Sequence, residues 1–95
     1  MEAFANLIAL AELAQKAGVL DDFFSLMFTP QEYEQLQKRY ALIEALIKDE
    51  LPQREISKDL QVSIAKITRG SNALKLIDPK LKAILENFFD KNKEY

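Results

Sequence analysis

The residues best suited to contact another molecule lie in residues 53–76, which read QREISKDLQVSIAKITRGSNALKL. In the second half of this stretch, helical spacing places a set of short, polar or cationic side chains on one outward face. The members of that set are Ala65, Lys66, Thr68, Arg69 and Asn72. Such side chains can approach base edges and phosphates without an apolar obstacle, so this face is suited to binding DNA.

Apolar spacing in the same stretch predicts two short helices joined by a tight turn, which is a helix-turn-helix pattern over residues 53–76. The first helix would bury Ile56 and Leu60, which stand four residues apart and share a face. Ser57 would supply a small side chain where the second helix crosses. Gln61 and Val62 would form the turn.

The second helix of the pair should begin after Ser63, whose hydroxyl can accept a hydrogen bond from a free backbone N–H. It would bury Ile64, Ile67 and Leu74. Many DNA-binding units carry Gly at the position of Gln61, since positive φ costs Gly nothing. Gln61 must therefore accept strain or use another turn geometry. The alternative reading of the pattern is an ordinary helical hairpin with a solvated polar face.

Composition excludes several classes of chemistry. The 95 residues include no Cys and no His, which excludes disulfides, thiolate and imidazole chemistry and the usual zinc sites. We therefore expect neither an enzyme nor a metal site. Net charge is −2, but residues 51–76 carry five cations and two anions, net +3, whereas the remainder carries eight cations and thirteen anions, net −5. The positive charge is concentrated where DNA binding is predicted, although the acidic remainder should weaken non-specific affinity.

The sequence favours a soluble, cytoplasmic protein without membrane contact. Its longest purely apolar run is residues 7–11, far shorter than the roughly 20 residues that a membrane span needs. The start of the chain carries Glu2 and lacks the basic segment of a secretory signal.

The elements that must position the 53–76 stretch read as helices throughout. Apolar residues of the helix expected over 2–17 cover more than one stripe, which favours an intertwined homodimer; a central helix of a bundle is the alternative. A short helix is expected over 21–27. Thr29, Pro30 and Glu32 form a capping box with proline at the first position of a helix reaching about Lys48.

The face of this third helix that we expect to be buried carries Tyr33, Leu36, Tyr40, Ile43 and Ile47, broadened by Leu42 and Leu46. Pro52 prevents its continuation, and Asp78 with Pro79 repeats the cap-and-proline start for a last helix. The tail over 90–95 should be frayed. No strand-like alternation occurs, so we predict one all-α domain over 1–95, with about six helices and an embedded helix-turn-helix.

The segments ITRGSNALK (67–75), LMFTP (26–30) and QRE (53–55), together with Arg39, are similar to those of the bacterial tryptophan repressor family. This resemblance extends from about residue 20 to residue 89. It implies a tryptophan-dependent repressor of operons for tryptophan biosynthesis and uptake, acting as an intertwined homodimer on double-stranded operator DNA. L-tryptophan would be the corepressor, setting the position of the two reading helices.

Six residues match the tryptophan site of the family: Leu26, Phe28, Thr29, Arg39, Arg69 and Gly70. By this resemblance, Arg39 and Arg69 sandwich the indole ring, and Arg69 also meets the carboxylate. A planar guanidinium can do both. Gly70 would allow the indole to approach closely, and close helix packing is the alternative explanation for this mid-helix Gly. Carbonyls at Leu26 and Phe28, with Thr29, would receive the ligand's ammonium group.

The residues that match or neighbour DNA contacts of the family are Gln53, Arg54, Ile64, Ala65, Lys66, Thr68 and Asn72. Three positions depart from the family's pattern. Ala73 replaces a serine that hydrogen-bonds the ligand, Lys66 replaces a small hydroxyl residue, and Ser57 replaces a cation that touches phosphate. Two other functions stay open: a DNA-binding regulator that does not need tryptophan, and an all-α protein-interaction module whose cationic helix binds an acidic protein.

Overall fold

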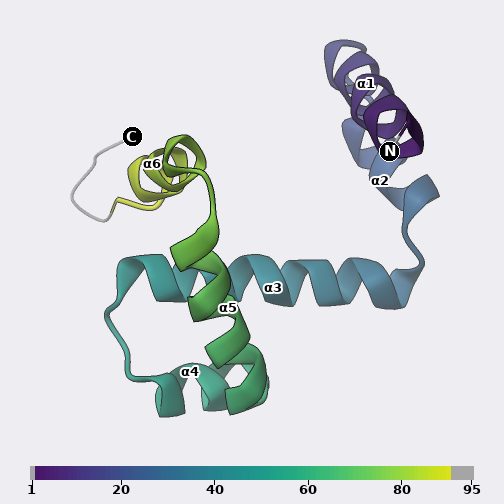
Figure 1. The fold of residues 1–95 in the computed structure, drawn as a ribbon. Coiled ribbons are helices and arrows are strands. Elements are labelled where there is room, and N and C mark those ends of the chain that lie inside the picture. Colours follow the sequence, from purple (N-terminus) through teal and green to yellow (C-terminus); the bar gives the residue numbers. More distant parts are fainter. Residues whose placement is uncertain (1, 91–95) are drawn as a thin grey trace. The chain divides into compact units, whose positions relative to one another are not determined.

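A computed structural model describes residues 2–90, and every regular element in that range is an α-helix (Figure 1). The helices are α1 (Glu2–Lys16), α2 (Leu20–Met27), α3 (Pro30–Lys48), α4 (Gln53–Leu60), α5 (Ile64–Leu76) and α6 (Pro79–Phe88). The predicted all-α class and the count of six helices are confirmed for this range. No helix in the described range is long and apolar enough to cross a membrane.

The described residues form two compact units, one ending at Leu36 and the other beginning at Gln37. The first two turns of α3 belong to the first unit and the rest of that helix to the second. Each unit is described by itself.

In the first unit, α1 packs against α2, and the chain passes between them through Gly18 at φ +76°. The start of α3 has the predicted capping box. Thr29 N–H donates to Glu32 Oε1 at 2.9 Å, and Glu32 N–H donates to Thr29 Oγ1 at 3.1 Å. These reciprocal bonds satisfy two backbone donors that the helix itself leaves free.

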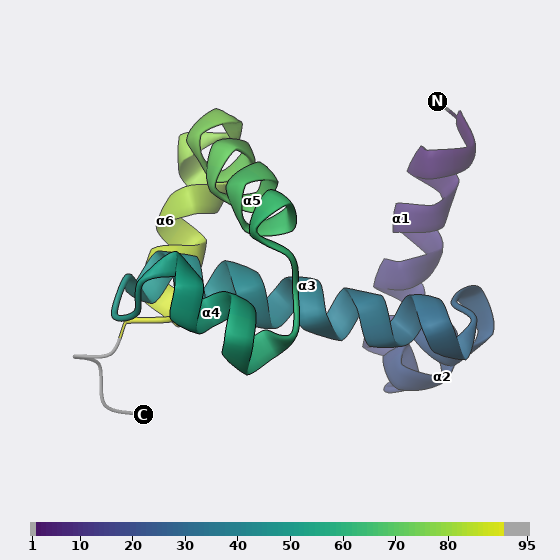
Figure 2. The ribbon, with the colours of Figure 1, turned by 90° about the horizontal axis from the view of Figure 1, so that it is seen from below.

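In the second unit, α3, α4 and α5, which Figure 2 shows from below, share a small core of buried side chains. Its buried members are Leu42, Ile56 and Ile67, of which Ile67 has 0% of its surface exposed. Beyond this cluster, the ring of buried Phe89 meets Tyr40 edge-on, with 5.5 Å between ring centroids. This core fixes α5 against α3 and α4.

Caps and left-handed residues set the helix ends of the second unit. Asp49 at φ 52° and Gln61 at φ 55° lie in the left-handed region, one on each side of α4. The side chain of Ser63 accepts a hydrogen bond from Lys66 N–H at 3.2 Å and so caps α5 as predicted. Asp78 caps α6 by accepting from Lys80 N–H at 2.8 Å.

Three predictions of burial were wrong. Ile64 is 48% exposed rather than buried, because it is the first residue of α5 and projects beyond the core. Leu36 and Tyr40 of α3 are also exposed, and the residue of this helix that is buried in the core of the second unit is Leu42. Helix α2 begins at Leu20, one residue before the predicted start. Apart from Asp90, the tail that we expected to fray lies outside the described residues.

Candidate functional site

The turn between α4 and α5 is held by hydrogen bonds to a single residue. The carbonyl of Ser57 accepts from the N–H of Gln61 and, at 3.2 Å, from the N–H of Val62. The half-buried Ser57 hydroxyl donates to the Val62 carbonyl at 2.6 Å. Gln61 adopts φ 55° and ψ 45°, which lie in the left-handed region. The turn therefore has the strained geometry, and not another one, and a residue with a Cβ pays a conformational cost there.

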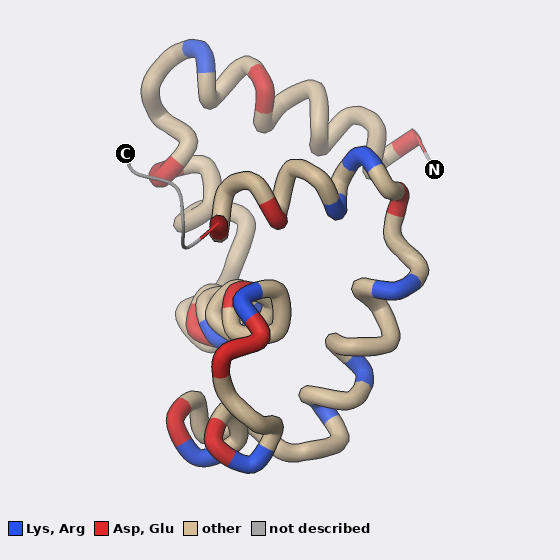
Figure 3. Tube along the Cα trace, turned by 90° about the vertical axis from the view of Figure 1, so that its left-hand side faces the viewer, with Lys and Arg blue, Asp and Glu red and all other residues tan. Residues whose placement is uncertain are grey.

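The outward face of α5 is fully available to solvent. Its five predicted members, Ala65, Lys66, Thr68, Arg69 and Asn72, are all exposed. Helix α5 carries Lys66, Arg69 and Lys75 and no acidic residue, as the run of blue segments in Figure 3 shows. Short polar side chains interspersed with cations give this helix the chemistry that phosphate and base contacts require.

Two other predicted DNA-contact residues lie at the start of α4. Gln53 and Arg54 occupy its first two positions and both are exposed. Ile64, at the start of α5, exposes the apolar surface that a thymine methyl group can contact. Every residue that we predicted to contact DNA is therefore accessible in the second unit.

Arg39 and Gly70 of the predicted tryptophan site lie next to each other in the second unit. A Cβ built on Gly70 would be 3.6 Å from Nη1 of Arg39. It would also be 3.2 Å from Cδ2 of Leu42 and 3.3 Å from Cδ1 of Leu46, and Gly70 is buried. Close packing of α5 on α3 therefore already requires a small residue here, which is the alternative that sequence reasoning kept open.

Sequence reasoning did not foresee how the carbonyl groups at the end of α2 lose their helical donors. The residue four positions after Leu26 is Pro30, which has no N–H to donate. The residue four positions after Phe28 is Glu32, whose N–H is engaged by the Thr29 hydroxyl. Leu26 is 79% exposed. The carbonyls of Leu26 and Phe28 thus lack an N–H donor four residues on, and a helix C-terminus with free carbonyls attracts a cation.

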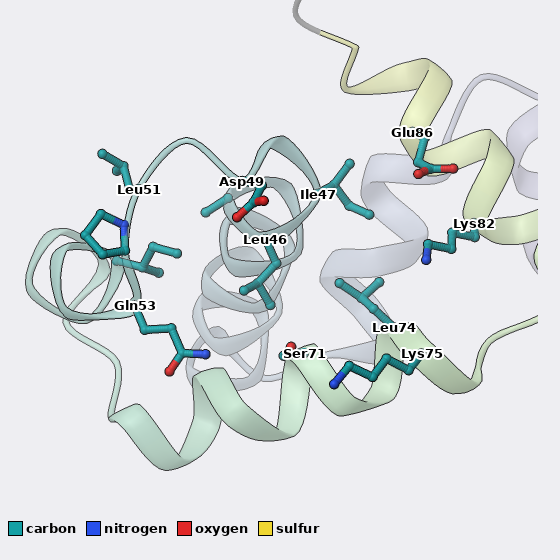
Figure 4. Close-up of a pocket in the computed structure, with 13 residues that line it drawn as sticks. Leu46, Ile47, Asp49, Leu51, Gln53, Ser71, Leu74, Lys75, Lys82 and Glu86 are labelled. Carbon is teal, nitrogen blue, oxygen red and sulfur yellow. The ribbon is translucent and has the colours of Figure 1, made fainter.

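A separate pocket of about 490 Å³ opens in the second unit between the end of α3, the start of α4, α5 and α6 (Figure 4). Leu46, Ile56 and Leu74 contribute apolar surface, and Lys75 and Glu86 contribute charges. The six predicted tryptophan-site residues are not among those that line it, so its position differs from the predicted ligand site.

In the described range, no three or more acidic side chains lie close enough together to hold a metal ion. Ala73, the departure from the family's serine, is half-buried on α5.

Comparisons with known proteins agree on one family. The sequence model of the Trp repressor protein family matches residues 2–88. A Trp operon repressor homolog of Chlamydia caviae is 50% identical over 92 residues, covering 97% of this chain and 88% of the relative. A homolog from Chlamydia trachomatis serovar D is 47% identical, covering 83% and 84%. One from Actinobacillus succinogenes is 36% identical, covering 95% and 89%.

Proposed function

This chain belongs to the Trp repressor protein family of transcription regulators, and we propose that it is a repressor whose binding to operator DNA depends on L-tryptophan. It would act as an intertwined homodimer in the cytoplasm, on operons for tryptophan biosynthesis and uptake. Residues 1–95 would form one functional domain, with a helix-turn-helix over 53–76.

In the proposed complex, α5 enters the major groove and α4 contacts the backbone beside it. The accessible face of α5 supplies Ala65, Thr68 and Asn72 for base edges, while Lys66 supplies a charge for phosphate. Gln53 and Arg54 at the start of α4 can bind phosphate oxygens, and Ile64 can contact a thymine methyl group. The net charge of +3 over residues 51–76 supports this assignment.

L-tryptophan would be bound by groups of complementary chemistry. Arg39 and Arg69 would hold the indole ring between guanidinium planes, and Arg69 would also pair with the carboxylate. The carbonyls of Leu26 and Phe28, with Thr29, would receive the ammonium group at the end of α2. In this chain Ala73 removes one hydroxyl from the site, so ammonium recognition depends more on these carbonyls.

The homodimer is supported by apolar surface that the single chain leaves uncovered. In α1, Phe4, Ile8 and Leu13 are exposed, Leu13 by 63%. In α6, Ile84 and Phe88 are exposed as well, Ile84 by 64%. A chain of this size is only marginally stable without more burial, and a second copy would cover these faces.

The observation that carries the proposal is that α5 places a predicted ligand residue and the predicted DNA-contact residues on one short helix. Gly70 of α5 lies against Arg39 of α3, while Thr68 and Asn72, two residues before and after it, are exposed. A ligand that contacts Arg39 and Arg69 would therefore act directly on the helix that reads DNA. By linkage, the DNA duplex must tighten tryptophan binding by the same factor that tryptophan tightens DNA binding.

A two-step titration tests this function. The purified protein is titrated with L-tryptophan, followed by ligand fluorescence at the red edge of excitation, since the chain has no Trp and three Tyr. Operator-like palindromic DNA is then added with and without tryptophan. We expect about a 100-fold gain in DNA affinity, which corresponds to about 2.7 kcal/mol of coupling.

Other outcomes separate the alternatives. Equal DNA affinity with and without tryptophan would identify a regulator that does not need this ligand. If no duplex binds and an acidic protein does, the chain is an interaction module.

A further inference from the structure

The half-buried hydroxyl of Ser57 is committed to the turn between α4 and α5. It donates to the Val62 carbonyl at 2.6 Å, while the carbonyl of the same residue accepts from the N–H groups of Gln61 and Val62. Ser57 thus contacts both residues of the turn from one position in α4. A hydroxyl that donates inward in this way is not directed at a DNA phosphate.

The turn that Ser57 holds requires a backbone conformation that costs free energy for the residue at position 61. Gln61 lies in the left-handed region at φ 55°, which Gly adopts freely and a residue with a Cβ does not. Ser63, two residues later, caps α5 by accepting from Lys66 N–H. The backbone of residues 61–63 therefore sets the direction in which α5 leaves the turn, and a relaxed Gln61 would change that direction.

We propose that Ser57 is a positioning residue for DNA recognition. Its hydroxyl fixes the Val62 carbonyl, keeps Gln61 in its left-handed conformation and so aims the exposed face of α5. This inference rests on the proposed function, because it assigns the orientation of α5 to the reading of DNA. It gives Ser57 a role without phosphate contact, at a position where the family commonly carries a cation.

DNA binding at 25 °C, with the protein folded and tryptophan saturating, tests the positioning role. The probes are a duplex that the wild-type protein selects from a random-sequence pool and an unselected duplex of equal length. Ser57→Ala should weaken binding to the selected duplex about tenfold, the equivalent of one hydrogen bond. Binding to the unselected duplex should change less than about twofold, because it depends on charge.

Matched variants separate the hydroxyl bond from a general loss of structure. Ser57→Thr keeps the hydroxyl and should restore selected binding to within about threefold of wild type. Ser71→Ala is the control, since Ser71 is a half-buried serine of the same unit and has no side-chain hydrogen bond among the described residues. It should leave the preference for the selected duplex unchanged.

A double-mutant cycle with Gln61→Gly tests the mechanism. Gly removes the cost of the left-handed conformation, so the Ser57 hydroxyl should matter less in that background. In the Gln61→Gly background, Ser57→Ala should weaken selected DNA binding about threefold or less instead of tenfold. The denaturant midpoints of the wild type, the two single variants and the double variant should likewise show a smaller effect of Ser57→Ala in that background.

The outcomes distinguish a failure of the positioning role of Ser57 from a failure of the proposed function. If Ser57→Ala loses selected and unselected binding equally, or if the cycle is additive, Ser57 has no positioning role. If the wild-type protein selects no duplex at all, the proposed function fails. The denaturation cycle needs no DNA and still decides whether Ser57 holds the turn.

Discussion

The two units of this chain differ in whether they bury a core of their own. In the second unit, Leu42, Ile56 and Ile67 come together with almost no exposed surface. In the described part of the first unit no residue is fully buried, and α1 exposes large apolar side chains. The second unit therefore has a core within one chain, whereas in the proposed homodimer a second copy would cover the apolar side chains of the first unit. Each prediction below is directed at this contrast.

The largest expected effect on stability comes from truncating a buried side chain in the core of the second unit. Ile67→Ala should lower the free energy of unfolding by about 2–5 kcal/mol, because Ile67 is completely buried. Ile64→Ala, the same change at a 48% exposed position of α5, is the control and should cost less than about 1 kcal/mol. Urea denaturation measures both. If both variants lost the same free energy of unfolding, α5 would not have a core face that is energetically distinct from its exposed face.

The next effect concerns the exposed face of α1. Leu13→Glu should weaken dimerisation about 10–100-fold, since burial of a leucine in the interface is worth about 1.5–3 kcal/mol. Gln15→Glu adds the same charge at an exposed position of α1 and should have little effect. Sedimentation velocity over a range of concentrations measures the association. A wild-type chain that sediments as a stable, folded monomer would contradict the dimer.

A smaller effect is expected for the ligand. Arg39→Lys keeps the charge beside Gly70 but loses the planar face, so tryptophan should bind about 3–30-fold more weakly. Arg54→Lys is the same exchange on α4 and should leave ligand affinity unchanged, because that residue is assigned to DNA. Ligand fluorescence measures both affinities. If Arg39→Lys binds tryptophan normally, the guanidinium of Arg39 does not stack on the indole ring.

Lys66 tests the DNA side of the second unit. Lys66→Ala should flatten the dependence of log affinity on log salt by about 1 per half-site, since one phosphate contact and its released counterion are lost. Lys80→Ala, at the start of α6, removes an equal charge away from the reading face and should leave the slope unchanged. A constant slope with altered base preference for Lys66→Ala would mean that Lys66 reads a base.

The smallest effect is expected from the surface of α3. Lys48 Nζ lies 2.9 Å from Glu44 Oε2, and the hydrogen bond to this carboxylate raises the pKa of Lys48. A raised lysine pKa stabilises the fold while the lysine is charged, and this contribution is lost only as the pH rises past about 10. Glu44→Gln should therefore lower stability slightly and by a constant amount between about pH 6 and 9. A difference that varies over this range would point to another titrating group.

Local signals in the sequence predicted most of the fold. Thr29, Ser63 and Asp78 each cap a helix where expected, because a cap depends only on side chains within three residues of the helix start. Burial was predicted less well, since it depends on which neighbours are present. Tyr40 follows the helical spacing of apolar residues but is exposed. Among the described residues, the aromatic ring that packs against it is that of Phe89.

The candidate site was predictable in residue type and less so in geometry. Spacing alone gave the exposed face of α5, and resemblance gave the tryptophan residues, which stay predictions. Sequence reasoning treated Ser57 as a small residue at a helix crossing and as the replacement of a phosphate-contacting cation, and it missed the hydroxyl bond of this residue. The available signal was a hydroxyl residue, Ser57, one helical turn before a turn position that is not Gly. The sequence alone does not show to which acceptor this hydroxyl donates.

The two left-handed residues that flank α4 have a consequence for how this repressor can evolve. Asp49 and Gln61 each occupy a conformation that costs glycine less free energy, so the present sequence holds unused stability directly after α3 and directly after α4. New base specificities commonly cost stability, and a protein close to its threshold tolerates few such changes. A lineage that first replaced Asp49 or Gln61 with glycine could accept destabilising substitutions on α5 that the present sequence would not survive.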